Sequence, residues 1–106
     1  MACTFRSAVA LAVVVTLASA VSFAESPGES VYKTSCQSCH GATGTPSPAM
    51  AKMMGIKASS DPDMQKLSAD QMIASVKDGK GKMKAFKDKL TDDQIKSAVT
   101  YFRTLK

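Results

Sequence analysis

The feature that most constrains this chain is Cys36-Gln37-Ser38-Cys39-His40, in which two thiols are separated by two residues and followed directly by an imidazole. This arrangement is typical of covalent haem attachment. In near-helical backbone the sulfurs of Cys36 and Cys39 lie on one side, within reach of both vinyl groups of one porphyrin. The imidazole of His40 can then bind the iron as its fifth ligand. The motif therefore predicts one covalently attached haem c per chain.

Three competing interpretations of this motif are weaker. A redox-active dithiol needs the strand and helix context of a thioredoxin-like domain, which this sequence does not offer. A structural zinc site needs four ligands, whereas only Cys36, Cys39 and His40 are available once Cys3 is set aside. A chance match is the third interpretation, since the motif fixes only three positions.

The N-terminal residues have the features of a secretory signal sequence. Arg6 is followed by a run of apolar and small residues that ends in small side chains. We predict a signal peptide over residues 1–24, which would carry Cys3 away, and a single domain over residues 25–106. The apolar run is shorter than the ~20 residues that span a bilayer, so we expect no permanent membrane span after cleavage. An uncleaved anchor is the alternative.

The predicted mature chain is small and basic. It has 82 residues, and without Arg6 it retains 13 Lys and Arg against 9 Asp and Glu, a net charge of +4. A chain of this length buries little apolar surface, so a haem would act as a second core. We expect no nucleic acid binding, because the sequence has no aromatic stacking platform and carries an export signal.

Helix start signals recur along the mature chain. Ser26-Pro27-Gly28-Glu29 combines a capping hydroxyl, a proline at the first helical position and an acid, which predicts a helix running into the haem motif. Two further helices are predicted by capping-box pairs, Ser68 with Gln71 and Thr91 with Gln94. The first of these should end at Gly79.

Shorter helical turns are expected between the first and second main helices. Ser47-Pro48 and Gly55 bracket one or two turns that carry three methionines, and Asp61-Pro62 opens another. No alternating run of β-branched and aromatic residues follows the leader, so we predict no strand. The fold class is therefore expected to be all-α.

This order of features resembles the class I c-type cytochromes, in particular the small soluble monohaem carriers of bacteria and photosynthetic organisms. Besides the haem motif, the likeness includes Gly28, Tyr32 and, in the last helix, Tyr101. In that family a glycine and an aromatic at these spacings let the first and last helices cross closely. The resemblance implies the cytochrome c fold, with three main helices plus short turns wrapped around one covalently attached haem.

The stretch from Gly79 to Phe86 is similar to the family loop that carries the sixth iron ligand, which implies Met83 as that ligand. A thioether favours ferrous iron and raises the reduction potential, as suits an electron carrier. The family commonly has proline after this methionine, whereas this chain has Lys84, so its loop should open more easily.

Composition does not single out Met83, because six methionines follow the leader. Met72 belongs to a helical apolar stripe and is expected in the core, and the main rivals as iron ligand are Met50, Met53 and Met54. In the family a proline carbonyl accepts a hydrogen bond from the axial histidine. Pro46 and Pro48 are both candidates for that role.

Six lysines lie between Lys77 and Lys89 against only two aspartates, so the region around the predicted ligand loop is basic. Such a run is either a solvated face or a collar that steers redox partner proteins with acidic docking surfaces.

We predict an exported one-electron carrier with His40 and Met83 on its iron, not an enzyme, in the periplasm or an equivalent compartment such as a thylakoid lumen. The alternatives are a haem enzyme or gas- or peroxide-reactive protein with a labile sixth ligand, and the cytochrome subunit of a larger oxidoreductase.

Overall fold

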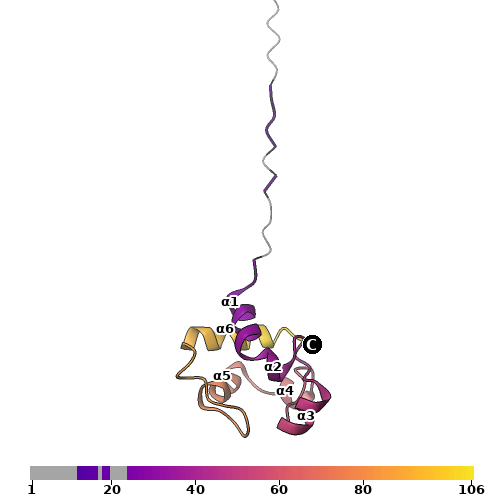
Figure 1. Ribbon diagram of the computed structural model, residues 1–106. Helices are drawn as coiled ribbons and strands as arrows, with labels where there is room; N and C mark the ends of the chain where they lie inside the picture. Colours follow the sequence, from indigo (N-terminus) through magenta and orange to yellow (C-terminus); the bar gives the residue numbers. More distant parts are fainter. Residues whose placement is uncertain (1–11, 17, 20–23) are drawn as a thin grey trace, which may run out of the picture.

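The structure, a computed structural model, describes residues 12–16, 18–19 and 24–106. The predicted signal peptide lies largely outside the described residues, as does Cys3. Residues 12–16 and 18–19 form neither helix nor strand and lie away from the helical body (Figure 1). Among the described residues, no helix has the length and apolar character needed to cross a membrane.

The described residues form six helices, α1 Pro27–Ser35, α2 Gln37–His40, α3 Pro48–Met54, α4 Pro62–Gln65, α5 Ala69–Asp78 and α6 Asp92–Phe102 (Figure 1). Their only extended pairing is an isolated antiparallel bridge between Lys80 and Met83. The all-α prediction is confirmed, and the short turns predicted after Ser47 and Asp61 are α3 and α4.

The three longest helices begin at their predicted caps. The hydroxyl of Ser26 accepts a hydrogen bond from the Glu29 N–H at 3.2 Å. The other two helices begin with complete capping boxes, Ser68 with Gln71 and Thr91 with Gln94. Each cap stabilises its helix by about 1 kcal/mol. Gly79 ends α5 with a φ of 78°, a conformation that glycine adopts without steric cost.

The core lies where α6 packs against α1 and α5. Its centre is formed by Met72, Ile95 and Val99, and partly buried side chains surround this centre, namely Met64, Leu67, Ile73, Val76, Leu90 and Phe102. Met72 is 9% exposed, so it is the core residue that its helical stripe predicts. It is therefore a poor candidate for the iron ligand.

The crossing of α1 and α6 also follows the prediction. Gly28 is buried and lies directly against the backbone of Ser97. Next to it the rings of Tyr32 and Tyr101 are 5.3 Å apart at a tilt of 58°, the arrangement that aromatic pairs prefer. The crossing fixes the end of α1 and with it the Cys-x-x-Cys-His motif.

Candidate functional site

The motif straddles a break between two helices. The helix predicted to run into the motif ends at Ser35, because Cys36 has a φ of −122° and a ψ of −34°. The carbonyl of Cys36 accepts hydrogen bonds from the N–H groups of Cys39 at 3.2 Å and His40 at 3.0 Å, which begins α2. The helix thus runs up to the motif as predicted, and the two thiols and the imidazole share the tight turn that follows.

The two thiols of this turn are free and half-buried. Burial raises the pKa of Cys36 to about 11, and the neighbouring Cys39 adds to the shift. A redox-active dithiol instead needs a lowered pKa. Among the described residues, no group of three or more His, Cys, Asp and Glu side chains is placed to hold a metal ion. The site therefore suits neither a dithiol redox centre nor an all-protein zinc cage.

His40 presents a neutral imidazole to the interior. Burial lowers its pKa, which keeps the ring deprotonated and able to bind a metal through a lone pair. The buried Nδ1 atom has no hydrogen-bond partner among the described residues. The imidazole, its orphaned Nδ1 and the two adjacent thiols form a donor set that fits a covalently held haem.

The loop after His40 folds back tightly on itself. Gly41 has a φ of 82°, and a Cβ added there would lie 2.0 Å from the Thr45 carbonyl oxygen. The hydroxyl of Tyr32 donates to the Gly41 carbonyl at 2.6 Å, which ties the loop to α1. Pro46, next in sequence to Thr45, is buried, whereas Pro48 is exposed in the first turn of α3.

An aromatic side chain of α6 supports the imidazole. The ring of Phe102 meets the ring of His40 edge-on at 5.5 Å and stacks near Tyr32 at 6.1 Å. Apolar residues recur every three or four positions in the last helix, at Ile95, Ala98, Val99, Phe102 and Leu105, and this spacing predicts that Phe102 faces inward. Its position beside His40 was not predicted. The spacing of apolar residues shows which face of the helix is buried, but it does not show which distant residue a side chain on that face contacts.

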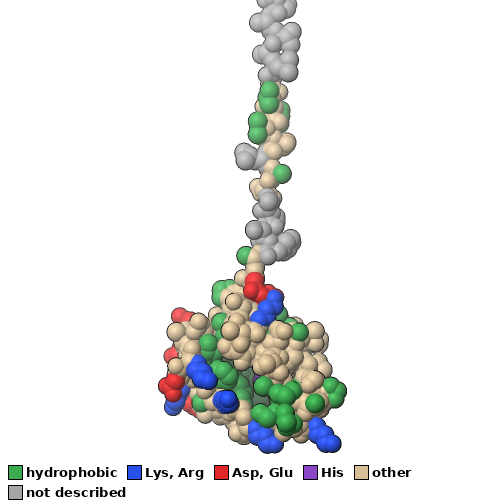
Figure 2. All heavy atoms as spheres, in the orientation of Figure 1, with side chains coloured by type: hydrophobic (Ala, Val, Ile, Leu, Met, Phe, Trp, Pro, Cys, Tyr) green, Lys and Arg blue, Asp and Glu red, His purple; other side chains and the backbone are tan. Residues whose placement is uncertain are grey.

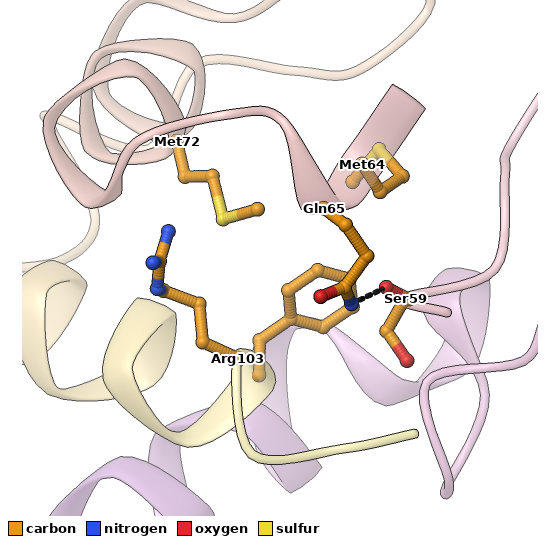
Figure 3. Close-up of a pocket in the computed structure, with 6 residues that line it drawn as sticks. Ser59, Met64, Gln65, Met72 and Arg103 are labelled. Atoms are coloured by element: carbon orange, nitrogen blue, oxygen red, sulfur yellow. Dashed lines mark hydrogen bonds between the residues drawn. The ribbon is translucent and has the colours of Figure 1, made fainter. Parts of the chain in front are cut away.

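Phe102 also lines a small cavity of about 50 Å³, together with Ser59, Met64, Gln65, Met72 and Arg103 (Figure 3). The amide of Gln65 donates to the Ser59 carbonyl at 2.6 Å, whereas the buried Ser59 hydroxyl has no partner among the described residues. That hydroxyl oxygen lies against Gly44, where an added Cβ atom would be only 2.4 Å from it.

The predicted ligand loop, residues 79–86, forms a tight hairpin turn. Lys80 and Met83 exchange backbone hydrogen bonds of 3.2 and 3.0 Å around Gly81, which has a φ of 58°. The Phe86 N–H donates to the Val76 carbonyl at 2.9 Å, so the end of the loop is anchored on α5. Met83 is half-buried. The loop thus holds its methionine at a defined position.

The rival methionines lie together on α3. Met53 is 59% exposed, while Met50 and Met54 are half-buried. Figure 2 shows hydrophobic side chains gathered on this side of the helical body beside a hollow, with Lys and Arg side chains along the lower edge. A short helix of flexible thioethers can adapt its surface to whatever packs against it.

The lysines around the loop fall into two groups. Lys77 pairs with Asp92 at 3.1 Å, and Lys82 donates to the Met53 carbonyl at 2.7 Å. The side chains of the other four lysines between Lys77 and Lys89 make no ion pair or hydrogen bond with the described residues, namely Lys80, Lys84, Lys87 and Lys89. We call these four the free lysines, and they are the main members of the predicted basic collar.

Comparisons with known proteins agree with the geometry. Residues 24–102 match the family described as cytochrome C oxidase, cbb3-type, subunit III. A cytochrome c6 from Leptolyngbya boryana is 36% identical over 77 residues, which are 70% of this chain and 84% of that protein.

Solved structures are similar as well. The KustC0563 c-type cytochrome superposes with a TM-score of 0.68 at 31% identity, covering 74% of this chain and 96% of the other. A mutant of the same protein gives a TM-score of 0.67 at 29% identity, covering 76% of this chain and all of the other.

Proposed function

The chain belongs to the c-type cytochromes, as one of the small class I proteins of that family. We propose that it carries single electrons between partner proteins on an iron bound by His40 and Met83. Its relatives are electron carriers, and the chain is a carrier rather than an enzyme. The observation that carries the proposed ligation is the half-buried neutral imidazole of His40, set directly after two free thiols.

Family membership implies a covalently bound haem c. Cys36 and Cys39 would hold the porphyrin through thioether bonds, which fix its position relative to α1. His40 would bind the iron through a ring nitrogen, since the lowered pKa of the imidazole leaves a lone pair free for the metal. When bound, the haem supplies a metal that gains and loses one electron.

We propose that Pro46 is the proline that supports His40 in the holoprotein, where its carbonyl would accept a hydrogen bond from Nδ1, an atom without a partner among the described residues. Of the two candidate prolines, Pro46 is buried and adjoins Thr45, which packs on Gly41 directly after the histidine. Pro48 is exposed and begins α3. Such a bond would fix the orientation of the imidazole and make it a stronger donor to the metal.

Met83 is the methionine best suited to be the second protein ligand of the iron. It is half-buried and held in a hairpin with anchors on both sides, whereas Met72 is packed in the core and Met53 points largely to solvent. Keeping the same two ligands in both oxidation states limits the rearrangement that accompanies each electron transfer. Met50 and Met54 are the remaining alternatives, because both are half-buried.

The partners are proposed to be redox proteins with acidic docking surfaces. The relative named cytochrome c6 supports a role in electron exchange between proteins. The free lysines give the ligand loop a positive surface that would attract such partners over about 8–10 Å at physiological ionic strength.

We further propose that residues 1–24 are a signal peptide and that the mature domain, residues 25–106, acts in the periplasm or an equivalent exported compartment. Cleavage would make Glu25 the first residue, where its carboxylate pairs with Lys33 of α1. Mass spectrometry of the purified protein tests this proposal. The expected mass is that of residues 25–106 plus one haem, and a mass retaining residues 1–24 would contradict it.

Absorption spectra of the purified ferric and ferrous protein test the proposed site. We expect a c-type spectrum with a weak far-red band in the ferric form, the signature of a thioether on iron. The ferrous form should bind carbon monoxide only slowly. A missing far-red band with rapid carbon monoxide binding would instead indicate an open sixth position and favour a haem enzyme or gas-reactive protein.

A further inference from the structure

We propose that Lys82 is a positioning residue that holds the ligand loop closed through its hydrogen bond to α3. This inference rests on the proposed function, in which Met83 of that loop binds the iron. The bond joins the Lys82 ammonium to the carbonyl oxygen of Met53 at 2.7 Å, across 29 residues of sequence.

The acceptor is a carbonyl in the last turn of α3, which ends at Met54. The last four carbonyls of a helix have no partner within the helix, and its C-terminal end carries partial negative charge. A lysine ammonium is suited to both features of this helix end, because it donates a hydrogen bond to an unpaired carbonyl and its positive charge offsets the partial negative charge. The contact is therefore a charge-assisted cap that comes from another part of the chain.

The donor, Lys82, is the residue next to Met83, so its hydrogen bond restricts the position of that methionine. Lys82 directly precedes Met83 in the hairpin that Lys80 and Gly81 begin. The far end of the loop is fixed to α5, where the Phe86 N–H meets the Val76 carbonyl. Among the described residues, the Lys82 bond is the hydrogen bond that fixes the loop to α3, so the methionine is held between two anchors on different helices.

Two features give this anchor particular weight. Residue 84 is a lysine rather than a proline, so the backbone after Met83 has no ring to restrict it. Lys80 and Lys84 flank the same hairpin and carry the same charge, yet neither side chain has a partner among the described residues. The anchoring role should therefore belong to Lys82 and not to positive charge in general.

The test compares holoprotein variants that lose the same charge. Lys82→Ala removes the anchor, Lys80→Ala and Lys87→Ala are matched controls, and Lys82→Arg keeps a cationic donor. Each ferric protein is mixed with imidazole, which can bind only after the loop releases the iron. Since a hydrogen bond to a charged group contributes about a tenfold change in equilibrium, Lys82→Ala should speed imidazole binding on the order of tenfold.

The two control variants should change that rate less than about twofold, and Lys82→Arg should stay near the parent protein. At rest, Lys82→Ala should keep the far-red band, because the loop is loosened and not lost. Equal rates for Lys82→Ala and Lys80→Ala would overturn the proposal, since charge alone would then explain the effect.

Amide hydrogen exchange gives a second readout. The Met83 N–H donates to the Lys80 carbonyl at 3.0 Å, and it should exchange faster in Lys82→Ala but not in Lys80→Ala. Unchanged exchange would overturn the proposal. This comparison of amide exchange between Lys82→Ala and Lys80→Ala does not depend on which residue binds the iron. A Met83→Ala protein that keeps the far-red band would instead overturn the ligand assignment in the proposed function.

Discussion

Gly28 in α1 lies so close to α6 that a Cβ atom added to it would meet the carbonyl oxygen of Ser97 at 2.1 Å. A backbone oxygen cannot rotate away as the end of a side chain can, so the two helices would have to separate. The rings of Tyr32 and Tyr101 pack at a tilt across the same crossing and would separate with the helices. The distance between these helices is thus set by one missing side chain.

We therefore expect Gly28→Ala to lower the free energy of unfolding of the holoprotein by about 1–3 kcal/mol, the usual cost of overpacking. Urea titration followed by circular dichroism measures this change. Ser30→Ala is the matched control, because Ser30 is exposed in the same helix. A variant at Gly28 as stable as the one at Ser30 would mean that the crossing is not tightly packed.

Replacing both Cys36 and Cys39 with Ala should prevent covalent attachment and leave a poorly folded chain. The protein core is centred on only three residues, and the expected 82-residue domain has little other apolar surface to bury. Denaturing gel electrophoresis with haem staining tests attachment, and circular dichroism tests folding. A helical, cooperatively unfolding apoprotein would contradict this expectation.

Met83→Ala should lower the reduction potential and open the iron to carbon monoxide, because the thioether that favours ferrous iron is lost. Met72→Leu should do neither and should cost less than about 1.5 kcal/mol in stability, as a core substitution of similar volume. Redox titration and the ferric far-red band measure both variants. Persistence of that band in Met83→Ala would point to Met50 or Met54 as the ligand.

Tyr32 should make stability depend on alkaline pH. Burial is the largest cause that raises its pKa from 10.0 to about 12, and it does not depend on whether Cys36 is a free thiol. A raised pKa in the folded state means that the associated stability is fully present below pH 10 and is lost as the pH rises to 12. Two pKa units correspond to roughly 3 kcal/mol.

Tyr32→Phe removes this titration together with the hydrogen bond to Gly41. The variant should be about 1 kcal/mol less stable at neutral pH, and the parent should lose roughly 3 kcal/mol relative to it by about pH 12. Denaturant titrations of the ferrous proteins measure the difference, and Tyr101→Phe, which keeps Tyr32, should follow the parent. Parallel pH curves for the parent and Tyr32→Phe would refute this account.

Charge reversal at Lys80 and Lys87 should slow electron exchange with an acidic partner at low salt and matter little at high salt. Both belong to the free lysines, whereas Lys82 is engaged with Met53 and its reversal would also disturb the loop. Screening of charges beyond about 10 Å removes the effect as salt is added. Stopped-flow kinetics at two ionic strengths measure it, and a salt-independent effect would argue against a docking collar.

The sequence predicted the starts of the helices well, because a helix cap depends only on interactions between residues a few positions apart. Ser68 and Thr91 need only the residues three positions later to begin a helix, and both capping boxes are present. The sequence predicts a helix running into the motif, but it does not show that Cys36 adopts a φ of −122° and separates α1 from a second short helix, α2.

Contacts between distant residues were harder to predict. The close approach of α1 and α6 was expected, because Gly28 and Tyr32 resemble a known pattern. The contact of Phe102 with His40 and the bond from Lys82 to Met53 have no counterpart in any short stretch of sequence. Both depend on how finished helices pack, which only the folded structure reveals.

The contact of Phe102 with His40 also bears on the order in which the site is built. A chain is synthesised from its N-terminus, so residues 36–40 exist well before α6 has been made. During that interval no ring from the last helix covers the imidazole, and α1 has no partner at Gly28. On the proposed function, a haem attached during that interval would meet an uncovered motif, and the docking of α6 would then bring Phe102 against the imidazole.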